Sequence, residues 1–77
     1  MSPNDRRMQQ VFREVFENDD LVLSDDMSQR TLAEWDSFAH IKLIIGLQEE
    51  FGVRFSTDEV ADVGNVPGIR AIIEARS

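Results

Sequence analysis

The chain has 77 residues, with 15 acidic and 8 basic side chains, a formal net charge of −7 and no cysteine. This length predicts one small domain over residues 1–77, with little room for an enclosed enzyme cleft, so we expect a carrying or binding protein and not an enzyme. The charge disfavours nucleic acid and anionic membranes as partners, and it favours proteins with basic surfaces. Without cysteine there is no disulfide, no thiolate metal site and no thiol nucleophile.

The sequence predicts neither a signal peptide nor a membrane span. The start lacks the apolar stretch of a signal peptide, and no apolar run is long enough to span a bilayer. We therefore expect a cytoplasmic protein. Mutual repulsion between copies of such charge predicts a monomer.

A first helix is predicted over residues 3–17, and a long loop follows over residues 18–36. Apolar residues recur at helical spacing in the first segment, at Met8, Val11, Phe12, Val15 and Phe16. The loop breaks this spacing, and connections longer than about 12–15 residues are commonly functional or disordered. Its apolar residues are expected to hold it to the core: Leu21, Leu23, Leu32 and Trp35.

A second helix is predicted over residues 37–51, ended by Gly52, which readily adopts a left-handed conformation. Its apolar residues form two stripes at 100° per residue. The inward stripe consists of Leu43, Ile44, Leu47 and Phe51. The second stripe, Phe38, Ile41 and Ile45, points to another side, and we interpret it as a partly exposed partner surface.

Two shorter helices complete the predicted fold. Ser56 and Glu59 form a capping box for a helix over residues 57–62. Asn65 can cap a last helix whose buried face is formed by Ile69, Ile72 and Ile73. No strand pattern is sustained. The sequence therefore predicts an all-α fold, a small four-helix bundle of three main helices and one short helix with a long first loop.

Chemistry is most plausible at Asp36-Ser37-Phe38, where the acidic loop meets the second helix. A hydroxyl at a helix start lies outside the helical hydrogen-bond ladder and close to free backbone N–H groups. A phosphodiester on Ser37 would lie favourably at the positive end of the helix dipole. Asp36 can cap the helix.

This region resembles the acyl carrier protein family, over essentially the whole chain. The matching residues are Asp36-Ser37-Phe38, Ile41, Leu43-Ile44-Ile45, the run from Leu47 to Val53, and Phe55-Ser56. The resemblance implies that a phosphopantetheinyl transferase attaches 4′-phosphopantetheine from coenzyme A covalently to Ser37, with Asp36 and Phe38 as motif partners. Acyl or aminoacyl groups would then travel as thioesters on that arm.

The resemblance also implies the partners: a loading ligase or transferase, and downstream enzymes with basic docking patches. We expect them to contact Ile41, Lys42, Ile45 and Glu49. Compared with the commoner family pattern, Ala39 and Lys42 stand where acids are frequent, and Gln48 replaces a frequent Glu. These differences favour a specialised polyketide, lipid or amino-acid-loading pathway over general fatty acid synthesis.

Other interpretations compete with this one. A small acidic adaptor could bind a partner helix through Phe38, Ile41 and Ile45 without any prosthetic group. A hydrolase using Ser37 and His40 is less favoured, because on the helical wheel His40 falls on the inward side, where we expect a hydrogen-bonded residue at the core edge. The loop acids lack EF-hand spacing, so no metal site is expected.

The first testable prediction concerns salt. Residues 17–36 include seven acidic residues and a single basic one, Arg30. Screening relieves repulsion between exposed charges, so the melting temperature near neutral pH should rise with added salt or divalent cation. Thermal unfolding at increasing salt measures this, and a flat or falling melting temperature would contradict it.

Overall fold

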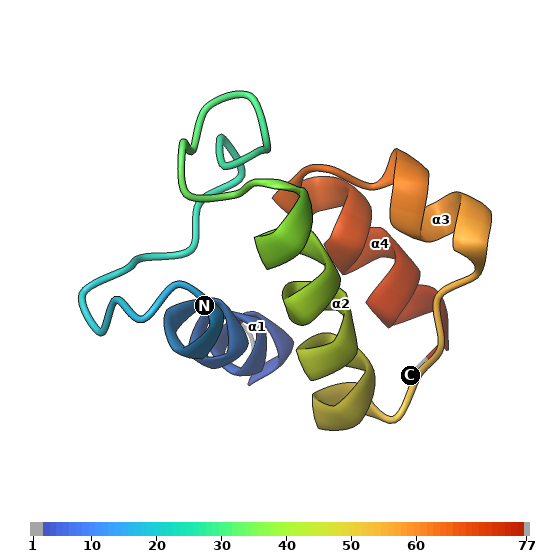
Figure 1. Cartoon of the computed structure of the whole chain (residues 1–77). Helices are drawn as coiled ribbons and strands as arrows, with labels where there is room; N and C mark the ends of the chain where they lie inside the picture. Colours follow the sequence, from blue (N-terminus) through green and yellow to red (C-terminus); the bar gives the residue numbers. More distant parts are fainter. Residues whose placement is uncertain (1–2, 77) are drawn as a thin grey trace.

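The computed structural model describes residues 3–76 and places four helices in that part of the chain. They are α1 (Pro3–Val15), α2 (Ser37–Phe51), α3 (Thr57–Asp62) and α4 (Val66–Arg76). In Figure 1, α2 runs through the middle, α1 lies on one side of it, and α3 and α4 lie on the other. Residues 3–76 include no strand, only an isolated bridge between Ser28 and Asn65. The predicted all-α bundle is confirmed.

Local sequence signals act at most helix ends as predicted. Asp36 caps α2, the Ser56 and Glu59 side chains form the capping box of α3, and the Asn65 side chain accepts a hydrogen bond from the Gly68 N–H at 2.7 Å at the start of α4. The first helix is shorter than predicted, because it ends at Val15 and Glu17 takes a left-handed φ of 52°. That conformation cannot continue a right-handed helix.

Two glycines shape α2. Gly52 adopts φ 66° and its N–H bonds to the Gln48 carbonyl at 2.9 Å, so it ends the helix as a left-handed cap. Gly46 lies where α1 crosses: a Cβ added there would stand 3.0 Å from the Val11 Cγ1. Glycine thus lets the two helices approach closely at this point.

One apolar core joins the helices and the loops; the short α3 has no fully buried residue, but its Val60 packs against this core while partly buried. Three residues of the inward stripe of α2 are buried, namely Leu43 and Leu47 at 0% exposure and Ile44 at 3%, while Phe51 at the end of the helix is partly buried. The remaining core residues come from α1, the loops and α4: Met8, Val11, Phe12, Leu21, Leu23, Trp35, Val53, Phe55, Val63, Val66, Ile69 and Ile73.

The long loop is held to this core by side chains and by hydrogen bonds to α1. Leu21, Leu23 and Trp35 are buried, as predicted. The Arg13 Nε donates to the Leu21 carbonyl at 2.7 Å, and the Leu23 N–H donates to the Gln9 side chain at 2.9 Å. The loop is therefore a packed part of the domain and delivers the chain to the start of α2 along a defined path.

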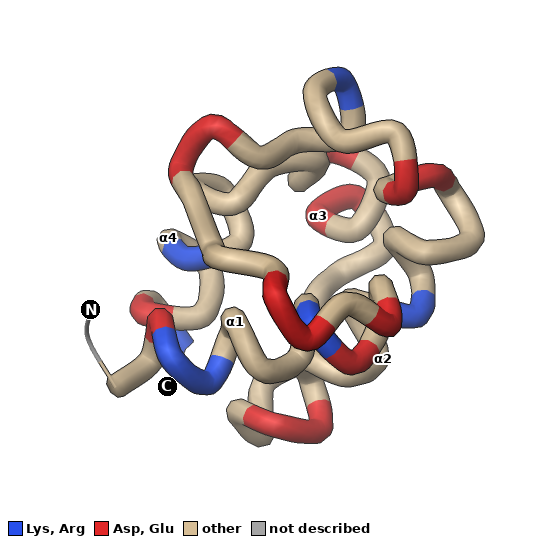
Figure 2. Tube along the Cα trace, turned by 90° about the vertical axis from the view of Figure 1, so that its left-hand side faces the viewer, with Lys and Arg blue, Asp and Glu red and all other residues tan. Residues whose placement is uncertain are grey.

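Arginine side chains bridge elements that are distant in sequence. Arg70 on α4 pairs with Asp5 on α1 at 2.9 Å and with Asp25 in the loop at 2.8 Å, which raises its pKa. Arg7 on α1 pairs with Glu50 at the end of α2 at 2.8 Å. Figure 2 shows that Asp and Glu outnumber Lys and Arg along the trace. Arg7 and Arg70 thus join distant parts of the fold, while most of the described acids are exposed.

A second prediction follows from the pair between Arg76 and Glu59, whose oxygens and guanidinium nitrogens lie 2.5 Å apart. Hydrogen bonds from the Arg76 side chain, and then from the Ser56 backbone, lower the pKa of Glu59 from 4.5 to about 2. Because the folded-state pKa is below the unfolded one, this stabilisation is complete above about pH 4.5 and is lost as the pH falls toward about 2.

The variant Glu59→Gln tests this dependence, since glutamine can keep the capping box but cannot form the ion pair. The difference in unfolding free energy between the wild type and the variant should shrink as the pH falls through that window. Urea unfolding at several pH values measures it. A difference that does not vary with pH would show that the ion pair makes no contribution.

Candidate functional site

Ser37 is the first residue of α2, and its side chain is exposed. The capping role next to it belongs to Asp36, whose Oδ1 accepts a hydrogen bond from the Ala39 N–H at 2.8 Å. Within residues 3–76 the Ser37 hydroxyl makes no hydrogen bond. Asp36 therefore caps the helix, and the Ser37 hydroxyl at the helix start is not needed for capping.

The helix start also has the right electrostatics for an anionic substituent. The first N–H groups of an α-helix have no intrahelical partner and carry partial positive charge. In α2 the Asp36 side chain accepts a hydrogen bond from the Ala39 N–H, and the Asp36 backbone carbonyl accepts one from the His40 N–H. The N–H groups of Ser37 and Phe38 precede these and remain at the positive end of the dipole.

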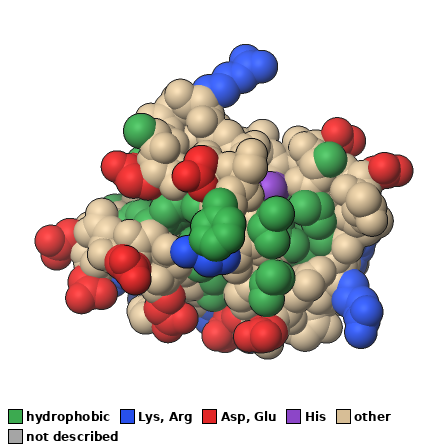
Figure 3. Space-filling model, in the orientation of Figure 1, with side chains coloured by type: hydrophobic (Ala, Val, Ile, Leu, Met, Phe, Trp, Pro, Cys, Tyr) green, Lys and Arg blue, Asp and Glu red, His purple; other side chains and the backbone are tan. Residues whose placement is uncertain are grey.

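The second stripe of α2 is exposed, as the sequence predicted. Phe38, Ile41 and Ile45 are 70%, 54% and 49% exposed. Figure 3 shows apolar side chains gathered near the middle of this face, with acidic side chains around them. The remaining large exposed apolar residue in the described part of the chain is Val22, at 67%, which was not among the predicted surface residues. Its signal was weak because it stands alone between two buried leucines.

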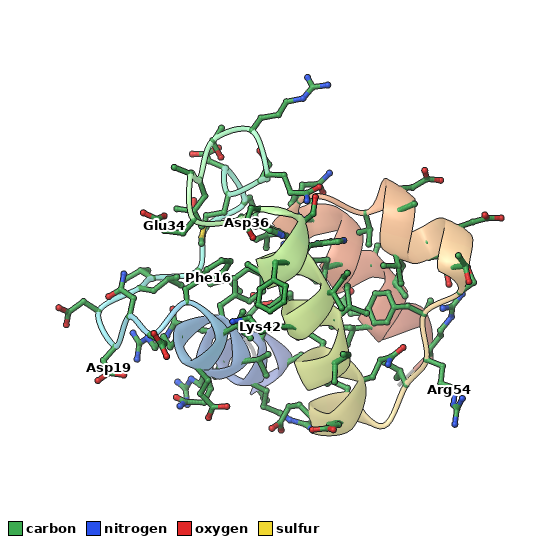
Figure 4. The ribbon with its side chains drawn as sticks, viewed as in Figure 1. Phe16, Asp19, Glu34, Asp36, Lys42 and Arg54 are labelled. Carbon is green, nitrogen blue, oxygen red and sulfur yellow. The ribbon has the colours of Figure 1, made fainter. Side chains whose placement is uncertain are left out.

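Lys42 lies beside this stripe, with its Nζ 5.0 Å from the centre of the Phe38 ring. This is a cation–π distance, so the ammonium group stays next to the most exposed aromatic residue of the face. Figure 4 labels Lys42 on the same side of α2 as the Phe16 label and far from Arg54. The contact places a positive charge within the apolar surface.

The two acids at the end of α2 differ in their surroundings. Glu50 bonds to Arg7 through its side chain at 2.8 Å, and its backbone carbonyl also accepts from Arg7. Glu49 is exposed and has no ion pair within residues 3–76. Of these two carboxylates, Glu49 is thus the one available to a basic partner.

His40 occupies the core edge, as predicted, and is 6% exposed. The Trp35 indole N–H donates to the His40 Nδ1 at 3.0 Å, and the His40 Nε2 lies 2.7 Å from the Val60 carbonyl oxygen. Both ring nitrogens are therefore occupied, so His40 is not poised to take a proton from Ser37. The helical spacing predicted a hydrogen-bonded histidine but could not identify these two partners.

A surface pocket of about 440 Å³ is formed within the segment that connects α1 to α2. Its lining is mainly apolar and includes Phe16, Leu21, Val22, Met27 and Leu32, with Asn18 and Glu34.

In the described part of the chain, no group of three or more His, Cys, Asp or Glu residues is placed to hold a metal ion. No helix among residues 3–76 is long and apolar enough to cross a membrane.

Comparison with known proteins gives a structural match. No family model matches the sequence, and no curated protein does. The holo acyl carrier protein from Geobacter metallireducens, solved by NMR, superposes with a TM-score of 0.85 and is 27% identical. The match covers 97% of this chain and 86% of that one.

The chain is therefore similar in sequence and in fold to a solved acyl carrier protein. This confirms the family resemblance seen in the sequence and the helical-bundle fold. It also confirms the expectation of a carrier protein, as opposed to an enzyme. The match supports, in general terms, a role as a carrier of acyl groups.

Proposed function

We propose that this chain acts as an acyl carrier protein, bears 4′-phosphopantetheine on Ser37 and works in a specialised pathway. The observation that carries the proposal is the exposed Ser37 hydroxyl, which has no hydrogen bond in residues 3–76 while Asp36 caps the helix. Attachment forms a phosphodiester between the Ser37 oxygen and the arm, and the nucleotide part of coenzyme A leaves. A phosphopantetheinyl transferase is the required partner.

The residues around Ser37 fit such a group. The phosphodiester is anionic, and it would lie at the positive end of α2 near the N–H groups of Ser37 and Phe38. The side chain of Ser37 faces solvent, so a transferase can reach it without opening the core. When bound, the arm supplies a terminal thiol that carries acyl or aminoacyl groups as thioesters, and the chain itself has no cysteine.

The chain's own contribution is then delivery. A rigid bundle holds the attachment point, while partner enzymes provide the active sites. We propose that the single domain spans residues 1–77, works as a monomer in the cytoplasm and does not engage nucleic acid. The net charge of −7 supports proteins with basic docking patches as partners, namely a loading ligase or transferase and the downstream enzymes.

The partner surface that we propose combines the exposed stripe with two charged residues. Phe38, Ile41 and Ile45 supply apolar contact, Lys42 supplies a positive charge beside Phe38, and Glu49 supplies a negative charge near the far end. Burying such apolar residues in an interface is favourable by about 25 cal/mol per Å². The charges then select among partners that fit the stripe.

This charge pattern supports a specialised pathway. An enzyme that docks a basic patch on an acidic helix would meet like charge at Lys42, and Glu50 is already paired with Arg7. Repulsion of this kind disfavours the unsuitable partner more than it strengthens the suitable one. A polyketide, modified-lipid or amino-acid-loading system fits better than general fatty acid synthesis.

The alternative function is an acidic adaptor that binds a partner through the same stripe and carries no prosthetic group. The large exposure of Phe38 and Ile41 is the observation that favours it. The two functions differ in whether Ser37 becomes modified with 4′-phosphopantetheine.

The third prediction is that the wild type gains one phosphopantetheinyl group from coenzyme A and a broad-specificity transferase, and that Ser37→Ala gains none. Since Asp36 supplies the cap, the substitution should cost less than about 1 kcal/mol of stability. Intact mass and helical circular dichroism measure the two effects. The control Ser24→Ala should be modified like the wild type. If Ser37→Ala still gains the full mass, Ser37 is not the site, and an unmodified wild type supports the adaptor.

The fourth prediction concerns Lys42. In the holo protein, Lys42→Glu should improve acylation by fatty-acid-synthesis enzymes and weaken loading by its own partner, each by about threefold to tenfold at low ionic strength. Acylation rates with both enzymes at two ionic strengths measure this. Arg54→Glu makes the same change in net charge at an exposed position away from the stripe, so it is the matched control. Equal effects of the two substitutions would show that Lys42 does not select the partner.

A further inference from the structure

Two buried polar side chains flank Ser37 and are bonded to each other. Trp35 lies two residues before it and is 1% exposed, and His40 lies three residues after it and is 6% exposed. The Trp35 Nε1 and the His40 Nδ1 are 3.0 Å apart. The bond therefore closes a short ring of chain that contains Asp36 and Ser37 and anchors both of its ends in the core.

The chemistry of the partners determines the state of the imidazole. An indole N–H can only donate, so the His40 Nδ1 must be unprotonated to accept it. A backbone carbonyl can only accept, so the Nε2 must carry the hydrogen in the 2.7 Å contact with the Val60 oxygen. One form satisfies both contacts, the neutral Nε2–H tautomer. An imidazolium would place an N–H against the indole N–H.

The hydrogen bond from His40 satisfies the backbone carbonyl of Val60, which has no partner within α3. Near the end of a helix the last carbonyls have no intrahelical partner. In α3 the Val63 N–H returns to the Glu59 carbonyl, and the Val60 carbonyl is met by His40 on α2. This six-residue helix has no fully buried residue, so the hydrogen bond from His40 adds to the partial packing of Val60 in holding α3 in place.

Trp35, the second residue of the bonded pair, also has defined neighbours. The Trp35 ring packs edge-on against Phe12, with ring centres 5.5 Å apart, and lies 6.3 Å from Phe16. Contacts therefore run from α1 through Trp35 and His40 to α3. The backbone that presents Ser37 lies in the middle of this sequence of contacts, between the two bonded side chains.

We propose that His40 is a positioning residue for Ser37: its neutral Nε2–H tautomer fixes Trp35, and hence the turn that presents the Ser37 hydroxyl, relative to α2 and α3. The inference rests on the proposed function of Ser37. His40 touches neither the arm nor the reacting atoms. It acts through Trp35 on the geometry of the attachment point, and small misplacements of a reacting group cost large factors in rate.

The substitutions that dissect the two bonds are His40→Asn and His40→Gln. The Asn amide oxygen takes roughly the place of Nδ1 and can accept from Trp35, whereas the Gln amide nitrogen reaches the place of Nε2 and can donate to Val60. His40→Leu removes both bonds. Ile73→Ala, a truncation at a 0% exposed position on α4, controls for a general loss of core stability.

The assay follows phosphopantetheinylation of each variant by intact mass at a temperature where all are folded, and separates kcat from KM for the carrier. His40→Leu and His40→Gln should lower kcat by about tenfold and change KM by less than about twofold, because the exposed stripe is intact. His40→Asn and Ile73→Ala should stay within about twofold of the wild type. Equal kcat for Asn and Gln, or a kcat for Leu equal to that of Ile73→Ala, would overturn the proposal.

Nitrogen NMR of the unmodified wild type gives a readout that needs no transferase. It should show one unprotonated Nδ1 and one protonated Nε2 for the single histidine at pH 7, and the indole N–H signal of the single tryptophan should move in His40→Gln but not in His40→Asn. A charged ring or the other tautomer at pH 7 would overturn the proposal even if His40→Leu fails to fold. A wild type that never accepts the arm refutes the proposed function, whereas a wild type modified as fast as every His40 variant refutes only the positioning role.

Discussion

The burial of Trp35 is the contact on which the arrangement around Ser37 depends. A long loop without regular hydrogen bonds loses much conformational entropy on folding, so it needs strong anchors to take one path. Trp35 provides the largest one, at 1% exposure, immediately before α2 begins. It meets Phe12 from α1 and bonds to His40 on α2. The start of α2, with its cap and its free hydroxyl, is thereby held against the core although it lies on the surface.

One face of α2 packs into the core, and the other forms the proposed partner surface. Leu43 and Leu47 are fully buried and join the helix to the core, while Phe38 and Ile41 remain more than half exposed. An exposed apolar stripe is unfavourable in water and is typical of a surface that is covered in a complex. Lys42, lying over the Phe38 ring, gives that surface a charge of its own. The same helix thus supplies the core, the attachment point and the proposed partner surface.

The distribution of charge follows a similar division. Arg7, Arg70 and Arg76 each link elements that are far apart in sequence, through acids on α2, α1, the loop and α3. With 15 acids and 8 bases, acids remain in excess after such pairing. The fold is therefore stabilised by its few cations, and its surface remains negative, which suits protein partners with basic patches.

The sequence by itself determined the features that depend on neighbours within about one helical turn. The caps at Asp36 and Asn65, the left-handed end at Gly52 and the buried stripe of α2 were all predicted, because each is specified by local hydrogen bonds or helical spacing. The place of Ser37 at a helix start was predictable for the same reason. Only the tertiary structure decided the rest: the bond between His40 and Val60, 20 residues apart, and the ion pair between Arg70 and Asp5, 65 residues apart. Such contacts depend on how the helices pack in space, and no local pattern along the chain specifies that.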